Sequence, residues 1–363
     1  MNKKLLTVAV AAAVAAPVAA LADVTIYGHL HMSVDYVSPD QGNAADDNLS
    51  VSSNSSRIGF KGTEDLGSGL KAVWQIESQV KLDESNVGGN STAWADRNSF
   101  LGVAGNFGTA IVGRHDTPFK ILSRSLDPFV DTIADTRQVL GQAAGTYELR
   151  PNNVIAYITP SFSGVSAVIA YVAGFNNGLT AGTESGMDNN NMSAWSMNAT
   201  YTNGPIYAGL AYEKHSLKND ATSPVTVIDD TDGFRIGGSY AFGAAKLGAM
   251  YEVIKDIPIG GTKDDRSAYT LFGTYDFGLN TAKLAYTQAD DYGNVKNGGS
   301  LVAVGLDHNF TKRTKAYVQY TSLDNNKGAT MSLGGGGGYG DAVTGAVAGN
   351  NPTAFSVGMI HKF

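Results

Sequence analysis

Segments in which apolar and polar side chains alternate recur along most of the chain. Residues 246–253 are one example, and residues 208–213, 281–287 and 315–321 repeat the pattern. Successive side chains of a β-strand point to opposite faces, so each segment predicts a strand with one apolar face and one wet face. Soluble sandwiches show the same alternation, but their strands usually have about 5–6 residues. These segments run nearer to ten residues, the length that a tilted membrane-spanning strand needs.

An aromatic residue beside a tight turn recurs between these segments. YAFG at residues 240–243 returns as YDFG at 275–278 and, more loosely, as HNFT at 308–311, at intervals of 35 and 33 residues. Repeats of this period also occur in solenoids and propellers. The alternation on both sides of each copy instead favours one β-hairpin followed by one longer loop.

The segments predict sixteen strands joined by connections that alternate in length. The strands are expected to begin near Val24, Asn54, Ser68, Ala95, Gly108, Arg150, Ser163, Ser193, Pro205, Thr231, Ala244, Asp264, Leu279, Gly299, Arg313 and Pro352. Short connections such as residues 64–68 and 105–108 alternate with long ones such as 38–53 and 116–149. An even number of antiparallel strands with this alternation is typical of an outer-membrane β-barrel with short periplasmic turns and long external loops.

Aromatic residues are expected to form a girdle at each rim of the barrel, as the headgroup level of a bilayer favours. Those at the short turns are Phe107, Phe162, Phe242, Phe277 and Phe310, and those at the far strand ends are Tyr212, Tyr251, Tyr286 and Tyr320. The chain also ends inside an alternating segment, at Phe363. A barrel closes by pairing its last strand with its first, here residues 24–37, so this ending is expected.

The first 22 residues have the features of a secretory signal peptide. Lys3 and Lys4 precede a short apolar run, and Ala20 and Ala22 form an A-x-A cleavage site. We therefore expect a signal peptide at 1–22 and a barrel domain at 23–363, with cleavage after Ala22. After this segment, no stretch approaches the ~20 apolar residues of a membrane-spanning helix, and the other structure that can span a bilayer is a closed barrel.

Composition narrows the function classes. The formal net charge of −7 becomes −9 once Lys3 and Lys4 are removed with the signal, and no basic tract is present. This balance argues against nucleic acid as the main partner. The chain has no cysteine, which excludes a disulfide framework and a thiolate metal site. Soluble periplasmic and secreted proteins stay open on composition alone, and the repeat and the loop alternation favour the barrel.

Several motifs then resemble the trimeric general porins of Neisseria, Burkholderia and their relatives. They are SSRIGFKGTEDLGSGLKA at residues 55–72, RNSFLG at 97–102, FGT at 107–109, VGR at 112–114, RPNNVIAY at 150–157 and GMIHKF at 358–363. The resemblance is spread over the whole mature chain and is most specific in its N-terminal third.

This resemblance implies a homotrimer of sixteen-stranded barrels in the Gram-negative outer membrane, each with a water-filled pore narrowed by an inward-folded third external loop. Residues 116–149, the longest internal connection, match that loop. In such porins, basic residues of the wall face acidic residues of the loop. The matching arginines and acids are Arg57, Arg97, Arg150 and, less clearly, Arg114, with Asp116, Asp127, Asp131 and Asp135. For each arginine, a salt bridge that pins the wall or the loop is an equal alternative.

Other constellations favour ordinary structural roles. His29 and His31 share a strand face but have no third ligand nearby in the sequence, so packing in the wall is favoured over a metal site. The acidic segment 229–233 lacks the terminal Glu of an EF-hand loop and is interpreted as an external loop that meets divalent ions bridging lipopolysaccharide. The glycine run 334–338 has no Lys-Ser/Thr after it, which favours a flexible loop over a phosphate-binding loop.

Passive diffusion of ions and small hydrophilic solutes is therefore the leading hypothesis for function, without an enzyme activity, a cofactor or a metal. A substrate-specific channel, an outer-membrane enzyme barrel and an adhesin are the alternatives. The six histidines are scattered and no G-x-S-x-G elbow exists, which disfavours the enzyme. The basic wall of the expected eyelet favours a weak preference for anions.

Overall fold

The structure is a computed structural model that describes residues 23–40, 48–83, 94–141, 147–175, 192–216, 230–259, 262–334 and 347–363. The expected signal peptide lies outside the described residues, as do Asp229 and residues 335–338 of the glycine run.

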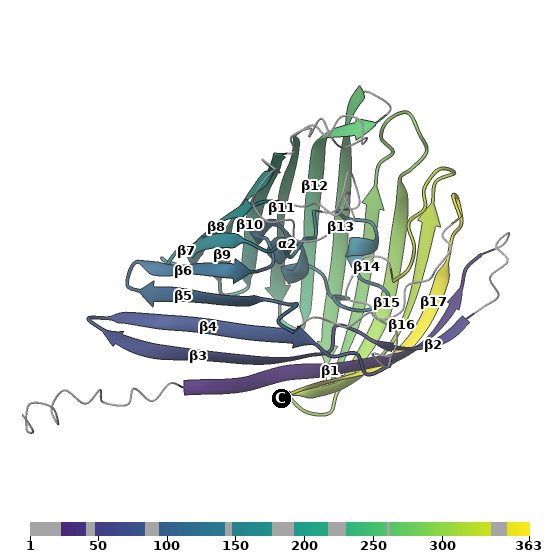
Figure 1. Ribbon diagram of the computed structural model, residues 1–363. Coiled ribbons are helices and arrows are strands. Elements are labelled where there is room, and N and C mark those ends of the chain that lie inside the picture. Colours follow the sequence, from purple (N-terminus) through teal and green to yellow (C-terminus); the bar gives the residue numbers. More distant parts are fainter. Residues whose placement is uncertain are drawn as a thin grey trace, which may run out of the picture.

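The described residues form one continuous antiparallel sheet that closes on itself (Figure 1). Its strands are β1 (Asp23–Ser38), β2 (Asn48–Ser53), β3 (Arg57–Gly67), β4 (Leu70–Gln79), β5 (Ser99–Gly105), β6 (Gly108–Arg114), β7 (Val154–Ile158), β8 (Val165–Ala173), β9 (Ser193–Asn203), β10 (Ile206–Ser216), β11 (Thr231–Phe242), β12 (Ala245–Ile259), β13 (Thr262–Phe277), β14 (Asn280–Ala289), β15 (Gly299–Asn309), β16 (Thr314–Asn325) and β17 (Thr353–Lys362).

Closure joins the two ends of the chain. β17 pairs with β1, and Gly28 and Phe363 exchange backbone hydrogen bonds of 3.2 and 3.1 Å. β2 and β3 pair with successive parts of β1 and are separated only by residues 54–56, so together they fill one position in the barrel. The 17 segments therefore make a closed barrel of 16 strands, which confirms the predicted fold class.

The predicted start of the second strand near Asn54 was wrong, because the strand already begins at Asn48. Leu49 and Val51 point outward and are exposed, while Ser52 is buried on the inner side. Three serines among the six residues of this segment favoured a loop in the sequence, whereas in a barrel they are suitable side chains for a wet inner face.

The outer face of the strands is mainly apolar, whereas the inner face carries the charged and polar side chains together with an apolar patch that packs against the third loop. Leu210, Ile236 and Leu284 are exposed on the outer surface, whereas Arg235 and Glu252 are buried within the barrel. This orientation is the reverse of a soluble domain and fits a lipid-facing wall around a hydrated interior. Among the described helices, none is long and apolar enough to cross a membrane.

Aromatic side chains are exposed at both ends of the strands. Phe242, Phe277 and Phe310 lie beside short turns, and Tyr251 and Tyr320 lie far from those turns along their strands. Such positions match the interfacial levels of a membrane barrel.

The third long connection, between β6 and β7, runs inside the barrel. It contains the helix α2 (Pro118–Ser125) and the short 3-10 helix η1 (Thr136–Gln138). Figure 1 shows α2 within the ring of strands, and it contacts β8 to β11. The inward fold was predicted, but the helix was not. Thr117 caps it by accepting a hydrogen bond from the backbone of Lys120, and Pro118 occupies its first turn, a signature that the sequence carries.

Candidate functional site

The first cluster of charges forms around Asp131, near the tip of the third loop. Its carboxylate lies 2.7 Å from Arg124 of α2, 3.3 Å from Arg137 of η1 and 3.7 Å from Arg57 of β3. Asp131 has a positive φ of 58°. Asp is one of the residues that tolerate this left-handed conformation. This turn therefore brings the carboxylate of Asp131, on the loop, close to Arg57 of the wall.

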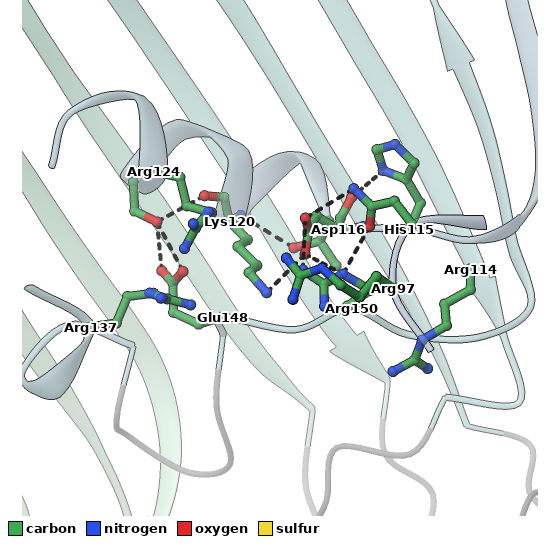
Figure 2. Close-up of polar contacts among 12 residues, drawn as sticks. Arg97, Arg114, His115, Asp116, Lys120, Arg124, Arg137, Glu148 and Arg150 are labelled. Atoms are coloured by element: carbon green, nitrogen blue, oxygen red, sulfur yellow. Dashed lines mark hydrogen bonds and ion pairs between the residues drawn. The ribbon is translucent and has the colours of Figure 1, made fainter. Parts of the chain in front are cut away.

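A second cluster forms around Asp116, where the loop leaves the wall. Lys120 lies 2.8 Å and Arg150 lies 3.1 Å from the same oxygen of its carboxylate. Arg150 also donates to the side chain of Asn98 at 2.9 Å. Figure 2 shows Lys120 and Arg150 converging on Asp116. Lys120 follows Asp116 by four residues at the start of α2, a spacing that favours such a pair.

Glu77 of β4 joins the wall arginines to each other. Arg97 donates to Glu77 at 2.8 Å, and Arg57 lies 3.7 Å from the other oxygen of the same carboxylate. No sequence pattern singles out Glu77, since an inward acid on a wall strand looks like any other alternating polar residue.

The structure gives the other candidate residues different surroundings. Asp127 accepts hydrogen bonds from the backbone of Phe129 and from the backbone and hydroxyl of Thr136. Asp135 caps η1 and holds Arg137 at 2.8 Å. Both acids thus shape the loop.

Arg114 donates to the backbone oxygen of Asp96 at 2.7 Å. Figure 2 shows its guanidinium lying apart from the cluster around Asp116. Arg114 is the arginine that the family resemblance matches least clearly, and its hydrogen bonds differ from those of the other three.

The loop acids differ in protonation. Burial alone raises the pKa of Asp131, but Arg124, Arg137 and Arg57 hold it far below its usual range. Lys120 and Arg150 do the same for the pKa of Asp116, again against the effect of burial. Both carboxylates therefore stay charged at any ordinary pH. For Asp127, burial and the nearby charge of Asp135 raise the pKa well above the usual range of a carboxylic acid.

The two clusters carry an excess of positive charge. Six basic side chains, Arg57, Arg97, Lys120, Arg124, Arg137 and Arg150, form ion pairs with four acids, Glu77, Asp116, Asp131 and Asp135. We call these ten residues the eyelet network. A separate group behind α2, Arg235 with Glu148 and Glu252, has two acids for one base.

The remaining candidate motifs carry no comparable site. The rings of His29 and His31 are 6.4 Å apart, and His31 is hydrogen-bonded to Tyr317 at 2.8 Å. Asp230 forms a surface ion pair with Lys214. In the described part of the chain, no three His, Cys, Asp or Glu side chains are grouped in a way that holds a metal ion.

A closed barrel with an apolar outer belt, a polar interior and a charged loop folded into its lumen defines an outer-membrane diffusion channel. The family model described as Gram-negative porin matches residues 8–328. The chain belongs to this family, and it is an outer-membrane porin that forms a channel for passive diffusion.

Individual relatives agree with this assignment. The chain is 32% identical to outer membrane porin protein 32 of Delftia acidovorans and 27% identical to the major outer membrane protein P.IA of Neisseria meningitidis, in both cases over the full length of both chains. The solved structure titled as an anion-selective porin from Comamonas acidovorans is similar with a TM-score of 0.76 and 29% identity, covering 94% of this chain and all of that one.

Proposed function

We propose that solutes cross this porin through an eyelet between the third loop and a wall lined by Arg57, Arg97 and Arg150, with a weak preference for anions. Asp116 and Asp131 are the loop acids that face this wall. Asp127 and Asp135 stabilise the conformation of the loop, and Arg114 stabilises the segment in which the loop leaves the wall.

The observation that carries this proposal is the difference in exposure between the two signs of charge. The three most exposed side chains of the eyelet network are Arg57 at 23%, Arg124 at 20% and Arg150 at 15%. Its four acids are exposed by 11% or less. Water and ions in the lumen therefore meet guanidinium groups before they meet carboxylates.

The physical consequence is a local field that differs in sign from the charge of the whole chain. The protein carries a formal net charge of −7, but the eyelet network has two positive charges in excess. In a narrow passage with low-dielectric walls, nearby fixed charges dominate over remote ones, and charges on the outer loops are screened within about 10 Å at 0.1 M salt. The name of the Comamonas structure as anion-selective supports the same direction.

The test replaces Arg57, Arg97 and Arg150 together by glutamine and measures the zero-current potential in planar bilayers under a KCl gradient. The expected result is a shift toward the equilibrium potential of the cation. The matched control replaces the exposed Lys255, Lys263 and Lys296 by glutamine, which removes the same charge from external hairpins. A potential that responds equally in both triple variants contradicts the proposed eyelet.

Assembly and export complete the proposal. We infer a homotrimer in contact with outer-membrane lipid and lipopolysaccharide, and removal of residues 1–22 during export. Native mass spectrometry of detergent-extracted protein tests both points, since it gives the number of subunits and the mass of each one. A monomer, or a subunit that retains the first 22 residues, contradicts the corresponding part.

A further inference from the structure

Three basic residues of the inner wall bind the backbone of the third loop. Arg235 of β11 donates to the carbonyl oxygen of Phe119 at 2.8 Å, and Lys283 of β14 donates to that of Pro128 at 3.2 Å. Arg266 of β13 donates to the carbonyl oxygen of Val139 at 3.2 Å. The three carbonyls lie at the start, the middle and the return of the loop.

Arg235 is the most extensively bound of the three. It is fully buried, and it contacts Glu148 of the loop at 2.7 Å and Glu252 of β12 at 3.0 Å. Its guanidinium also lies 4.0 Å from the centre of the Phe119 ring.

The two carboxylates extend this contact to further parts of the loop. Glu148 accepts the hydroxyl of Ser123 at 2.9 Å, and Glu252 accepts the backbone N–H of Gly141 at 3.0 Å. One wall cation thus ties together both arms of the loop.

Two glycines of the wall let the loop approach closely. A Cβ atom at Gly209 of β10 would lie 2.6 Å from Leu122, and one at Gly237 of β11 would lie 2.5 Å from Leu126. Both distances are shorter than a van der Waals contact, so a larger residue at either position would force the leucine side chain to shift. Leu122 and Leu126 are fully buried against this surface.

We propose that Arg235, Arg266 and Lys283 are positioning residues that fix the depth of the third loop, and that they thereby determine the cross-section of the pore. The eyelet arginines determine its charge. If the loop left its seat, the buried guanidinium of Arg235 would lose its two loop partners, the carboxylate of Glu148 and the carbonyl of Phe119, which is unfavourable in a poorly hydrated site. The inference rests on the proposed path beside the third loop.

The experiment compares the wild type with the single variants Arg235→Met, Arg266→Met and Lys283→Met, each purified as a folded, heat-modifiable barrel. Single-channel conductance and the largest polyethylene glycol that enters the pore report its size. We expect conductance to change by about two-fold or more and to fluctuate, since a barrel of this size leaves a wide channel once its loop is free. Arg235→Lys keeps the positive charge but not the planar fork of donors, so it should change the conductance less than Arg235→Met.

A disulfide tether tests whether the conductance depends on the position of the loop or on the charge of Arg235. The chain has no cysteine, so Leu122→Cys with Gly209→Cys introduces a single pair at two positions in contact, and its disulfide is designed to hold α2 against the wall. In this background, Arg235→Met should conduct like the oxidised Cys-pair protein with Arg235 intact, and reduction should restore the altered conductance. A change that persists in the oxidised protein, or an unaltered conductance in all three untethered variants, overturns the proposal.

The two proposals can fail independently. An unaltered zero-current potential in the triple glutamine variant of Arg57, Arg97 and Arg150 would contradict the eyelet assignment and leave the positioning residues in place. Altered selectivity of the Met variants at unaltered pore size would instead contradict the positioning role.

Discussion

Replacing Asp131 by asparagine removes the one loop carboxylate that is surrounded by three arginines. The positive φ of 58° at this position suits asparagine as well as aspartate, so the turn should keep its backbone. Arg57 and Arg124 are partly exposed and can be hydrated when their partner loses its charge. The substitution therefore changes the charge of the eyelet more than its shape, from two positive charges in excess to three.

The size of the effect follows from Coulomb's law. For an ion about 5 Å from the removed charge in water, the interaction is about 0.8 kcal/mol, and salt at 0.1 M reduces it to about 0.5 kcal/mol. The barrier falls by this amount for an anion and rises by it for a cation. The ratio of anion to cation permeability should thus increase by about five-fold, because 1.4 kcal/mol corresponds to a factor of ten.

The assay is the zero-current potential across a planar bilayer with a KCl gradient, recorded for wild type and Asp131→Asn. The potential of the variant should move toward the chloride equilibrium potential. Asp256→Asn is the matched control, because it removes the same charge from the half-exposed hairpin between β12 and β13. An unaltered potential in Asp131→Asn, or an equal shift in the control, would refute the argument that the charge of Asp131 acts on the permeating ion.

Three further predictions concern pH, closure and loop packing. Burial lowers the pKa of Lys120 to about 8, so its positive charge is lost as the pH rises from about 7 to 9. The anion preference should therefore fall over this range, and Lys120→Gln should abolish that part of the pH dependence. Gly28→Val places a Cβ 2.3 Å from a backbone oxygen and 2.7 Å from the ring of Phe363, so the yield of heat-modifiable barrel after refolding should fall severely, and a normal yield contradicts the closure shown here. Leu126→Ala should lower the free energy of unfolding of the barrel in urea by about 2–5 kcal/mol, because Leu126 is fully buried. Leu247→Ala on the exposed outer face should lower the free energy of unfolding in detergent by less.

The barrel could be predicted from the sequence because its signal is repeated many times. Alternation of side chains, the spacing of the aromatic turns and the length of alternate loops all have the same cause, an antiparallel wall between lipid and water. The second strand was misplaced because its inward serines resemble a loop when the barrel interior is not considered.

The site could be predicted only in part. Arg57 and Arg150 were expected on the wall and lie in the eyelet network, but their partners depend on how the third loop folds. Lys120 and Arg124 come into position only through the helix α2, whose cap at Thr117 was the overlooked signal. Arg235 is separated from Phe119 by more than a hundred residues, and no local pattern of the sequence predicts such a contact.

The most direct test of the account is a single-channel recording of the purified wild-type protein in a planar bilayer with a KCl gradient. Stepwise conductance increments that are linear in voltage, with a zero-current potential on the chloride side, are the predicted result. Absence of conductance steps contradicts the open pore, and a zero-current potential on the potassium side contradicts the basic eyelet.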